Sequence, residues 1–165
     1  MTLEIAKVSS PIGRITLAVR DGRLCALSSE AHWPRTRKAL EKRFGKLELR
    51  RAGDPAGVVK SLRAYFRGDI EALGRISVDP GGTPFQREVW GALRKIRAGG
   101  TAAYKDLARK IGRPTATRAV GAASGANPIW VVIPCHRLIG ADGALGGYAG
   151  GIDRKRWLLR HEGAI

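Results

Sequence analysis

The sequence predicts an α+β fold, with a small antiparallel sheet and helices in the first part and mostly helices in the second. Alternating apolar and polar residues, typical of half-buried strands, occur near the start of the chain. Apolar residues at helical spacing prevail after residue 83. A Pro/Gly cluster, Asp79-Pro80-Gly81-Gly82, separates the two patterns. We therefore expect an N-terminal α/β lobe at residues 1–79 and a C-terminal domain at residues 80–165.

The N-terminal part opens with strand patterns joined by turns. Asp21-Gly22 is a hairpin signal between two apolar segments, and helical spacing begins after Pro34. The expected elements, in order, are three strands, two helices and a short strand, at residues 3–8, 15–19, 23–27, 35–44, 56–66 and 76–78.

The C-terminal part begins with a clear helix start. Thr83 can cap the helix, Pro84 suits its first position, and Gln86 can complete a capping box. The helix is expected to end at Gly99-Gly100, after a buried apolar stripe made of Phe85, Val89, Trp90, Leu93 and Ile96.

Two further helical segments, residues 104–111 and 115–126, flank a Gly112-Arg113-Pro114 turn. This layout indicates a winged helix-turn-helix-like motif of the kind that binds DNA, although antiparallel helix pairs in general share it. The second helix carries a single long polar side chain, Arg118, among small residues. Because major-groove readers present several such side chains, we favour nonspecific minor-groove binding. Tight helix packing is the alternative explanation of the small residues.

The chain is strongly basic throughout, with a formal net charge of +16 and a pI near 11.0. Residues 1–80 hold 16 basic and 9 acidic groups, and residues 81–165 hold 14 and 5. The excess is therefore spread over the folded body, which indicates a polyanionic partner such as nucleic acid. A solvated basic surface without a partner is the alternative. No amphipathic terminal helix suggests a membrane surface.

Targeting and metal-binding signals are lacking. No signal peptide and no apolar run of about 18 residues occur, so we expect a soluble, cytoplasmic protein with no membrane partner. The two cysteines, Cys25 and Cys135, are expected to stay reduced. His32, His136 and His161 are dispersed, so we expect neither a metal nor a cofactor.

The segment Ile129–Arg137 is the strongest candidate for chemistry. An apolar run long enough for a buried strand delivers Cys135 and His136 at a corner stiffened by Pro134. A thiol is nucleophilic as the thiolate, and burial opposes its ionisation, so a nearby base or cation is needed. His136 and Arg137 are suitable residue types. The alternative is a structural cysteine, since neighbouring residues on a strand face opposite ways.

A glycine-rich segment, residues 140–151, follows, and it lacks the ending of a phosphate loop. Its backbone could approach a flat ligand closely, with Tyr148 as a stacking face, or it could be a flexible connection. Asp153 is then expected to cap a last helix that holds Leu158 and Leu159, with Glu162 near its end.

Taken together, these motifs resemble the O6-alkylguanine-DNA alkyltransferases, also called methylated-DNA–protein-cysteine methyltransferases. The resemblance runs almost unbroken over residues 82–163, whereas the N-terminal part matches in layout alone. The segments that carry it are Arg118-Ala119-Val120-Gly121, Asn127-Pro128, Pro134-Cys135-His136-Arg137, Gly147-Tyr148-Ala149-Gly150-Gly151 and Leu158-Leu159-Arg160-His161-Glu162.

The resemblance implies a monomer that binds double-stranded DNA through the minor groove and flips an alkylated guanine into a pocket. Arg118 would fill the gap left in the base stack. Its neighbours Thr115, Ala119 and Gly121 would contact the DNA. The pocket would be lined by Trp130, Gly146, Gly147, Tyr148 and Ala149.

The resemblance also implies the chemistry. Cys135 would take the alkyl group from O6-alkylguanine, and possibly from O4-alkylthymine, and would keep it, so that each molecule acts once. His136 would deprotonate the thiol through one water, and Glu162 would orient His136. Tyr104 would protonate the leaving base, and Asn127 would brace the turn around the site.

Some residues depart from the family pattern or leave alternatives open. Trp130 occupies a place where relatives often carry a smaller residue, so a ring facing the pocket mouth would hinder bulky adducts. Cys25 lacks the partners of the zinc site found in some relatives. Two other functions fit part of the pattern: a helix-turn-helix regulator with a structural Cys135, and a Cys-His hydrolase.

Overall fold

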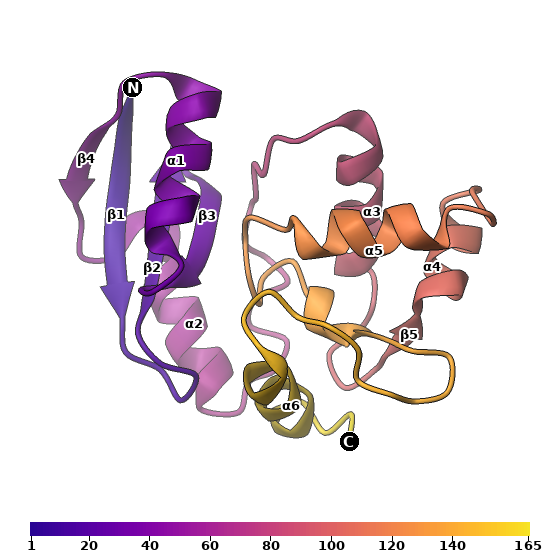
Figure 1. Ribbon diagram of the computed structural model, residues 1–165. Coiled ribbons are helices and arrows are strands. Elements are labelled where there is room, and N and C mark those ends of the chain that lie inside the picture. Colours follow the sequence, from indigo (N-terminus) through magenta and orange to yellow (C-terminus); the bar gives the residue numbers. More distant parts are fainter. The chain divides into compact units, whose positions relative to one another are not determined.

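The computed structural model describes all 165 residues and divides into two compact units, residues 1–81 and 82–165 (Figure 1). The sequence pattern placed this division at residues 79–80. Both helices and strands occur in each unit, as expected for an α+β protein. No helix in either unit has the length and apolar character needed to cross a bilayer.

The N-terminal unit is built on a four-stranded sheet of order β3-β2-β1-β4. The strands are β1 (Thr2–Val8), β2 (Ile15–Arg20), β3 (Arg23–Ser29) and β4 (Glu48–Arg51). The first three pair antiparallel, as predicted. The fourth was not predicted, and it pairs parallel to β1, which makes the sheet mixed. Its sequence shows no apolar alternation, because β4 lies at the sheet edge with a single partly buried apolar residue, Leu49.

The helices of this unit are α1 (Trp33–Phe44) and α2 (Val58–Phe66), preceded by the short η1 (Pro55–Gly57). Helix α2 begins later than predicted, because Ala56 and Gly57 have positive φ angles of 56° and 72°. Leu40 of α1 joins the core cluster that contains Leu3, Ile5, Ala18, Cys25 and Ala26. The short strand predicted at residues 76–78 is reduced to one bridge, between Leu24 and Val78.

The C-terminal unit is mostly helical. Its elements are α3 (Pro84–Arg94), β5 (Ala102–Ala103), α4 (Tyr104–Lys110), α5 (Thr117–Gly125), η2 (Cys135–Arg137), β6 (Leu138–Ile139) and α6 (Ile152–His161). The predicted capping box at Thr83 and Gln86 is present, although α3 ends before Gly99. Trp90 of α3 donates a hydrogen bond from Nε1 to the Ala123 carbonyl of α5 at 2.8 Å. This bond fixes the two helices against each other.

The helix pair α4–α5 and the small parallel sheet β5–β6 form the predicted motif. The pairing of Ala102 with Leu138 brings the start of α4 next to the end of η2, although the two segments lie far apart in the sequence. It thereby positions Tyr104, the first residue of α4, near the Cys-His corner.

The strand predicted over the apolar run that ends at Ile133 is wrong. The run folds into successive turns, closed by hydrogen bonds from Val132 N to Trp130 O at 2.8 Å and from Ile133 N to Ile129 O at 3.1 Å. Val131 takes a positive φ of 69°, which a β-branched residue rarely adopts. The apolar character of the run suggested a strand, but its residues belong to neither sheet.

The start of α6 also differs from expectation. Gly151 caps the helix, and Asp153 lies in its first turn, where a carboxylate is favoured by the helix dipole. Leu158 and Leu159 are buried, as the helical spacing predicted, and Glu162 caps the C-terminal end.

Candidate active site

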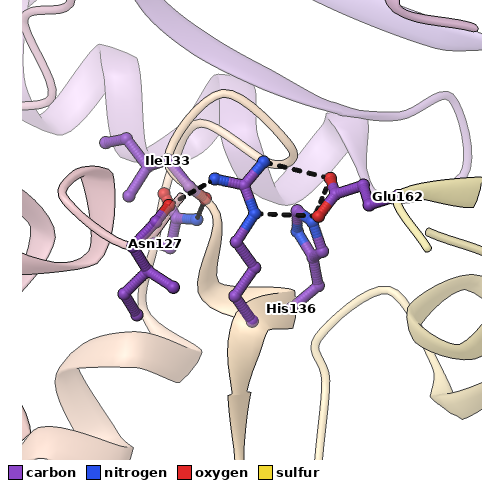
Figure 2. Close-up of polar contacts among 6 residues, drawn as sticks. Asn127, Ile133, His136 and Glu162 are labelled. Atoms are coloured by element: carbon purple, nitrogen blue, oxygen red, sulfur yellow. Dashed lines mark hydrogen bonds and ion pairs between the residues drawn. The ribbon is translucent and has the colours of Figure 1, made fainter. Parts of the chain in front are cut away.

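Cys135 is the first residue of η2, and its side chain is almost fully buried. Its Sγ accepts a hydrogen bond from Asn127 Nδ2 at 3.2 Å. Asn127 also donates to the Ile133 carbonyl at 2.8 Å (Figure 2). It accepts from the Ile129 amide at 2.9 Å. One amide side chain therefore fixes both ends of the turn and supplies a donor to the sulfur.

The thiol is protonated in the resting site. Burial raises the pKa of Cys135 to about 11, and the Asn127 hydrogen bond and the positive charge of Lys155 act in the opposite direction. A hydrogen-bond donor and a nearby cation both favour the thiolate. The sulfur is thus held where a thiolate would be stabilised, but a base must remove its proton.

His136 is the base nearest in the chain, and its ring is fully buried. Its Nε2 lies 2.8 Å from Glu162 Oε2, and Nδ1 has no hydrogen-bond partner (Figure 2). Burial lowers the pKa of His136, against the opposing effect of Glu162. Because η2 is helical, Cys135 and His136 do not face opposite ways as they would on a strand.

Glu162 is held as a carboxylate. Burial by itself would raise its pKa, but the hydrogen bonds from His136 and Arg137 keep the pKa well below its usual range. Arg137 donates from Nε to Oε1 at 2.8 Å and from Nη2 to Oε2 at 3.1 Å. The sequence interpretation named Arg137 as a cation near the thiol, whereas the structure pairs it with Glu162.

A cavity of about 240 Å³ opens beside the thiol. Its lining residues are Tyr104, Gly121, Ser124, Gly125, Cys135, Gly147, Tyr148 and Ala149. The cavity therefore brings together the Cys135 thiol, α4, α5 and the glycine-rich segment. Ser124 and Gly125 were not predicted, although they lie three and four residues after Gly121 and so share its face of α5.

Two residues expected in the pocket do not line it. The Trp130 ring is buried, with its centroid 6.0 Å from that of Tyr148, so it supports the lining residue instead of facing the pocket mouth. Gly146 lies beside Tyr104, since a Cβ at this glycine would be 3.1 Å from the tyrosine hydroxyl oxygen. A larger side chain here would displace Tyr104.

Tyr104 keeps its proton, because burial and the nearby Cys135 raise the pKa of its hydroxyl. It can therefore act as a donor toward a group in the cavity. On the same motif, Thr115, Arg118 and Ala119 are exposed. They are free to contact a partner that docks on α5.

Lys155 is a further site residue that the sequence did not indicate. It is fully buried in α6, and its Nζ donates to the carbonyls of Leu138 at 2.6 Å and Gly147 at 3.2 Å. The ammonium thus ties the glycine-rich segment to β6 and places a positive charge near the thiol. The signal was its spacing, because residue 155 shares a helix face with the buried Leu158, Leu159 and Glu162.

The chain also matches the domains of a known protein family. Residues 84–164 match the 6-O-methylguanine DNA methyltransferase DNA binding domain, and residues 5–80 match the ribonuclease-like domain of the same family.

The relatives match over nearly their whole length. A methylated-DNA–protein-cysteine methyltransferase from Shigella flexneri is 45% identical, covering 96% of this chain and 95% of the relative. One from Mycolicibacterium paratuberculosis is 46% identical, covering 97% and 92%. The crystal structure of Mycobacterium tuberculosis OGT in complex with DNA superposes with a TM-score of 0.80 at 39% identity, covering 99% and 94%. The chain therefore belongs to the 6-O-methylguanine DNA methyltransferase family.

Proposed function

We propose that this protein repairs alkylated DNA directly, by transferring the alkyl group from O6 of guanine, or from O4 of thymine, to its own Cys135. The observation that carries the proposal is the thiol at the wall of a cavity that α5, the second helix of the DNA-binding motif, also lines. A base turned out of a duplex bound at this helix would have its reactive carbon within reach of the sulfur.

The transfer begins with removal of the thiol proton. His136 accepts this proton at Nδ1, through one water, while its Nε2–H remains hydrogen-bonded to Glu162. The thiolate then attacks the alkyl carbon, forming the S–C bond as the C–O6 bond breaks. Asn127 and Lys155 favour the anion before it attacks.

Guanine leaves with the electron pair of the broken bond. Tyr104, which remains protonated at the cavity wall, donates to a ring nitrogen and neutralises the leaving base. The product on Cys135 is a thioether, which has no easy leaving group. Each molecule therefore acts once.

The DNA-binding role rests on the charge and the small side chains of α5. The net charge of +16 attracts the phosphate backbone, and Thr115, Arg118 and Ala119 are exposed on the motif. Small residues allow α5 to approach a narrow groove, and Arg118 is long enough to replace the flipped base. The reaction would take place in the cytoplasm, where thiols stay reduced.

Mass measurement of the intact protein tests the proposal. After incubation with duplex DNA that carries O6-methylguanine, we expect one methyl group per molecule, located on Cys135. Cys135→Ser should gain none, and Cys25→Ser, the matched control, should gain one. A regulator would bind the duplex and stay unmodified, and a Cys-His hydrolase would turn over an ester without regard to DNA. Either outcome would exclude the proposal.

A further inference from the structure

Arg137 makes more contacts than a simple ion pair requires. Besides its two bonds to Glu162, it donates from Nη1 to the Ile96 carbonyl at 2.7 Å, and its side chain is 10% exposed. Two bonds to the Glu162 carboxylate and a third to the Ile96 carbonyl fix the guanidinium, and Figure 2 shows Glu162 next to His136. Arg137 therefore holds Glu162 in place while Glu162 holds His136.

The charges of this cluster, counted together, point to a specific role. A buried histidine beside a lone carboxylate would be protonated, because the opposite charge favours the cation. Here Arg137 already balances the carboxylate. Protonation of His136 would leave an unbalanced positive charge on side chains with no exposed surface, and burying such a charge is costly.

We propose that Arg137 is a positioning residue that keeps His136 neutral in the resting protein, with Nδ1 free to accept the proton of Cys135. The inference rests on the proposed function. The geometry supports this role, because His136 Nδ1 has no hydrogen-bond partner. In the neutral ring Nε2–H donates to Glu162, and Nδ1 carries the lone pair that can accept a proton. The direction of the His136 pKa agrees: burial lowers it, and the charges of Arg137 and Lys155 add to that effect.

The charge of Arg137 should determine how the transfer rate depends on pH. With Arg137 intact, His136 accepts a proton at neutral pH, so the transfer rate changes little there. Without the positive charge, Glu162 would keep His136 protonated at rest, and the rate would fall as the pH falls. The titratable or charged groups that face or act on His136 are Cys135 and Arg137 from η2, Lys155 and Glu162 from α6, and Tyr148 from the glycine-rich segment.

The test compares Arg137→Gln, which keeps a donor and loses the charge, with Arg137→Lys, which keeps the charge. We expect the midpoint of the pH–rate profile in Arg137→Gln to rise until it lies about one pH unit above neutral, which gives about a tenfold loss of rate near neutral pH. The loss should be recovered in alkaline buffer, and Arg137→Lys should keep the flat profile. A loss of the same factor at every pH would overturn the inference.

Histidine NMR on the unmodified protein gives a second measurement that needs no variant. His136 should remain neutral, with its proton on Nε2, from about pH 6 to pH 8. An imidazolium signal for His136 at neutral pH would overturn the inference even if the variants fail to fold. The NMR titration does not involve alkyl transfer, so it separates failure of this inference from failure of the proposed function.

Discussion

The two units bury polar side chains of different kinds. In the N-terminal unit these are hydroxyl residues: Thr16, Ser28, Ser29 and Thr36. In the C-terminal unit they include an amide and four ionisable groups: Asn127, His136, Arg137, Lys155 and Glu162. A hydroxyl needs one or two hydrogen bonds to be satisfied, whereas a buried charge needs a partner of opposite charge or several strong donors. The N-terminal core therefore buries no charged side chain, whereas the C-terminal core holds ionisable groups whose charges must be balanced.

The two cysteines show the same contrast at single residues. Both are buried, and burial raises the pKa of each. The thiol of Cys25 lies 3.6 Å from the Arg23 carbonyl, to which it can donate, so its surroundings favour the protonated form. The sulfur of Cys135 instead accepts from Asn127, which favours the thiolate. Burial is common to both thiols, and their hydrogen-bond partners distinguish them.

The largest expected effect is on stability. Glu162→Ala should lower the free energy of unfolding by about 3–5 kcal/mol, because it leaves the buried Arg137 without its partner. Ser28→Ala, the matched change in the N-terminal unit, should cost about 1 kcal/mol, since it removes hydrogen bonds between neutral groups. Urea unfolding at neutral pH measures both. Equal losses of unfolding free energy in the two variants would show that the buried ion pair contributes no more than a hydrogen bond between neutral groups.

The effect of Glu162→Ala on the free energy of unfolding should depend on pH. The pKa of Glu162 is lowered on folding, so its contribution is complete above the unfolded value of about 4.3 and is lost as the pH falls toward the folded value. The stability gap between wild type and Glu162→Ala should narrow by about 1.4 kcal/mol per pH unit below about pH 4. A gap that stays constant in acid would contradict the buried ion pair.

Asn127→Ala should have the next largest effect, on the reaction rate. It removes the donor to Cys135, and hydrogen bonds to charged groups contribute about 1.5–3 kcal/mol, so methyl transfer at neutral pH should slow by roughly ten- to a hundredfold. Single-turnover assays measure the loss. Thr36→Val, which alters a buried hydrogen bond in the N-terminal unit, is the control and should leave the rate unchanged.

The sequence predicted most elements of both units but failed in informative places. β4 was missed because an edge strand buries too little to show alternation. The strand predicted across Ile129–Ile133 became turns, because an apolar run reports burial and does not report the backbone path.

The candidate site was also predicted in part. The residues Cys135, Tyr104 and Tyr148 were expected at the pocket, and all three line it. Lys155 escaped notice because a lysine on a basic helix is ordinarily solvated. The pairing of Arg137 with Glu162 depends on the three-dimensional packing, and the positions of the two residues in the sequence do not indicate it.

The smallest expected effect compares one exposed arginine in each unit. Arg118→Ala on α5 should slow repair of duplex DNA by about tenfold, because nothing then replaces the flipped base, and should leave the reaction with free O6-methylguanine base unchanged. Arg63→Ala on α2 removes the same charge from an exposed position in the N-terminal unit. Paired rate measurements on duplex and free base separate the two roles. If both variants slow duplex repair equally, Arg118 supplies general positive charge alone. If Arg118→Ala also slows the reaction with free base, Arg118 affects the pocket and not the base stack.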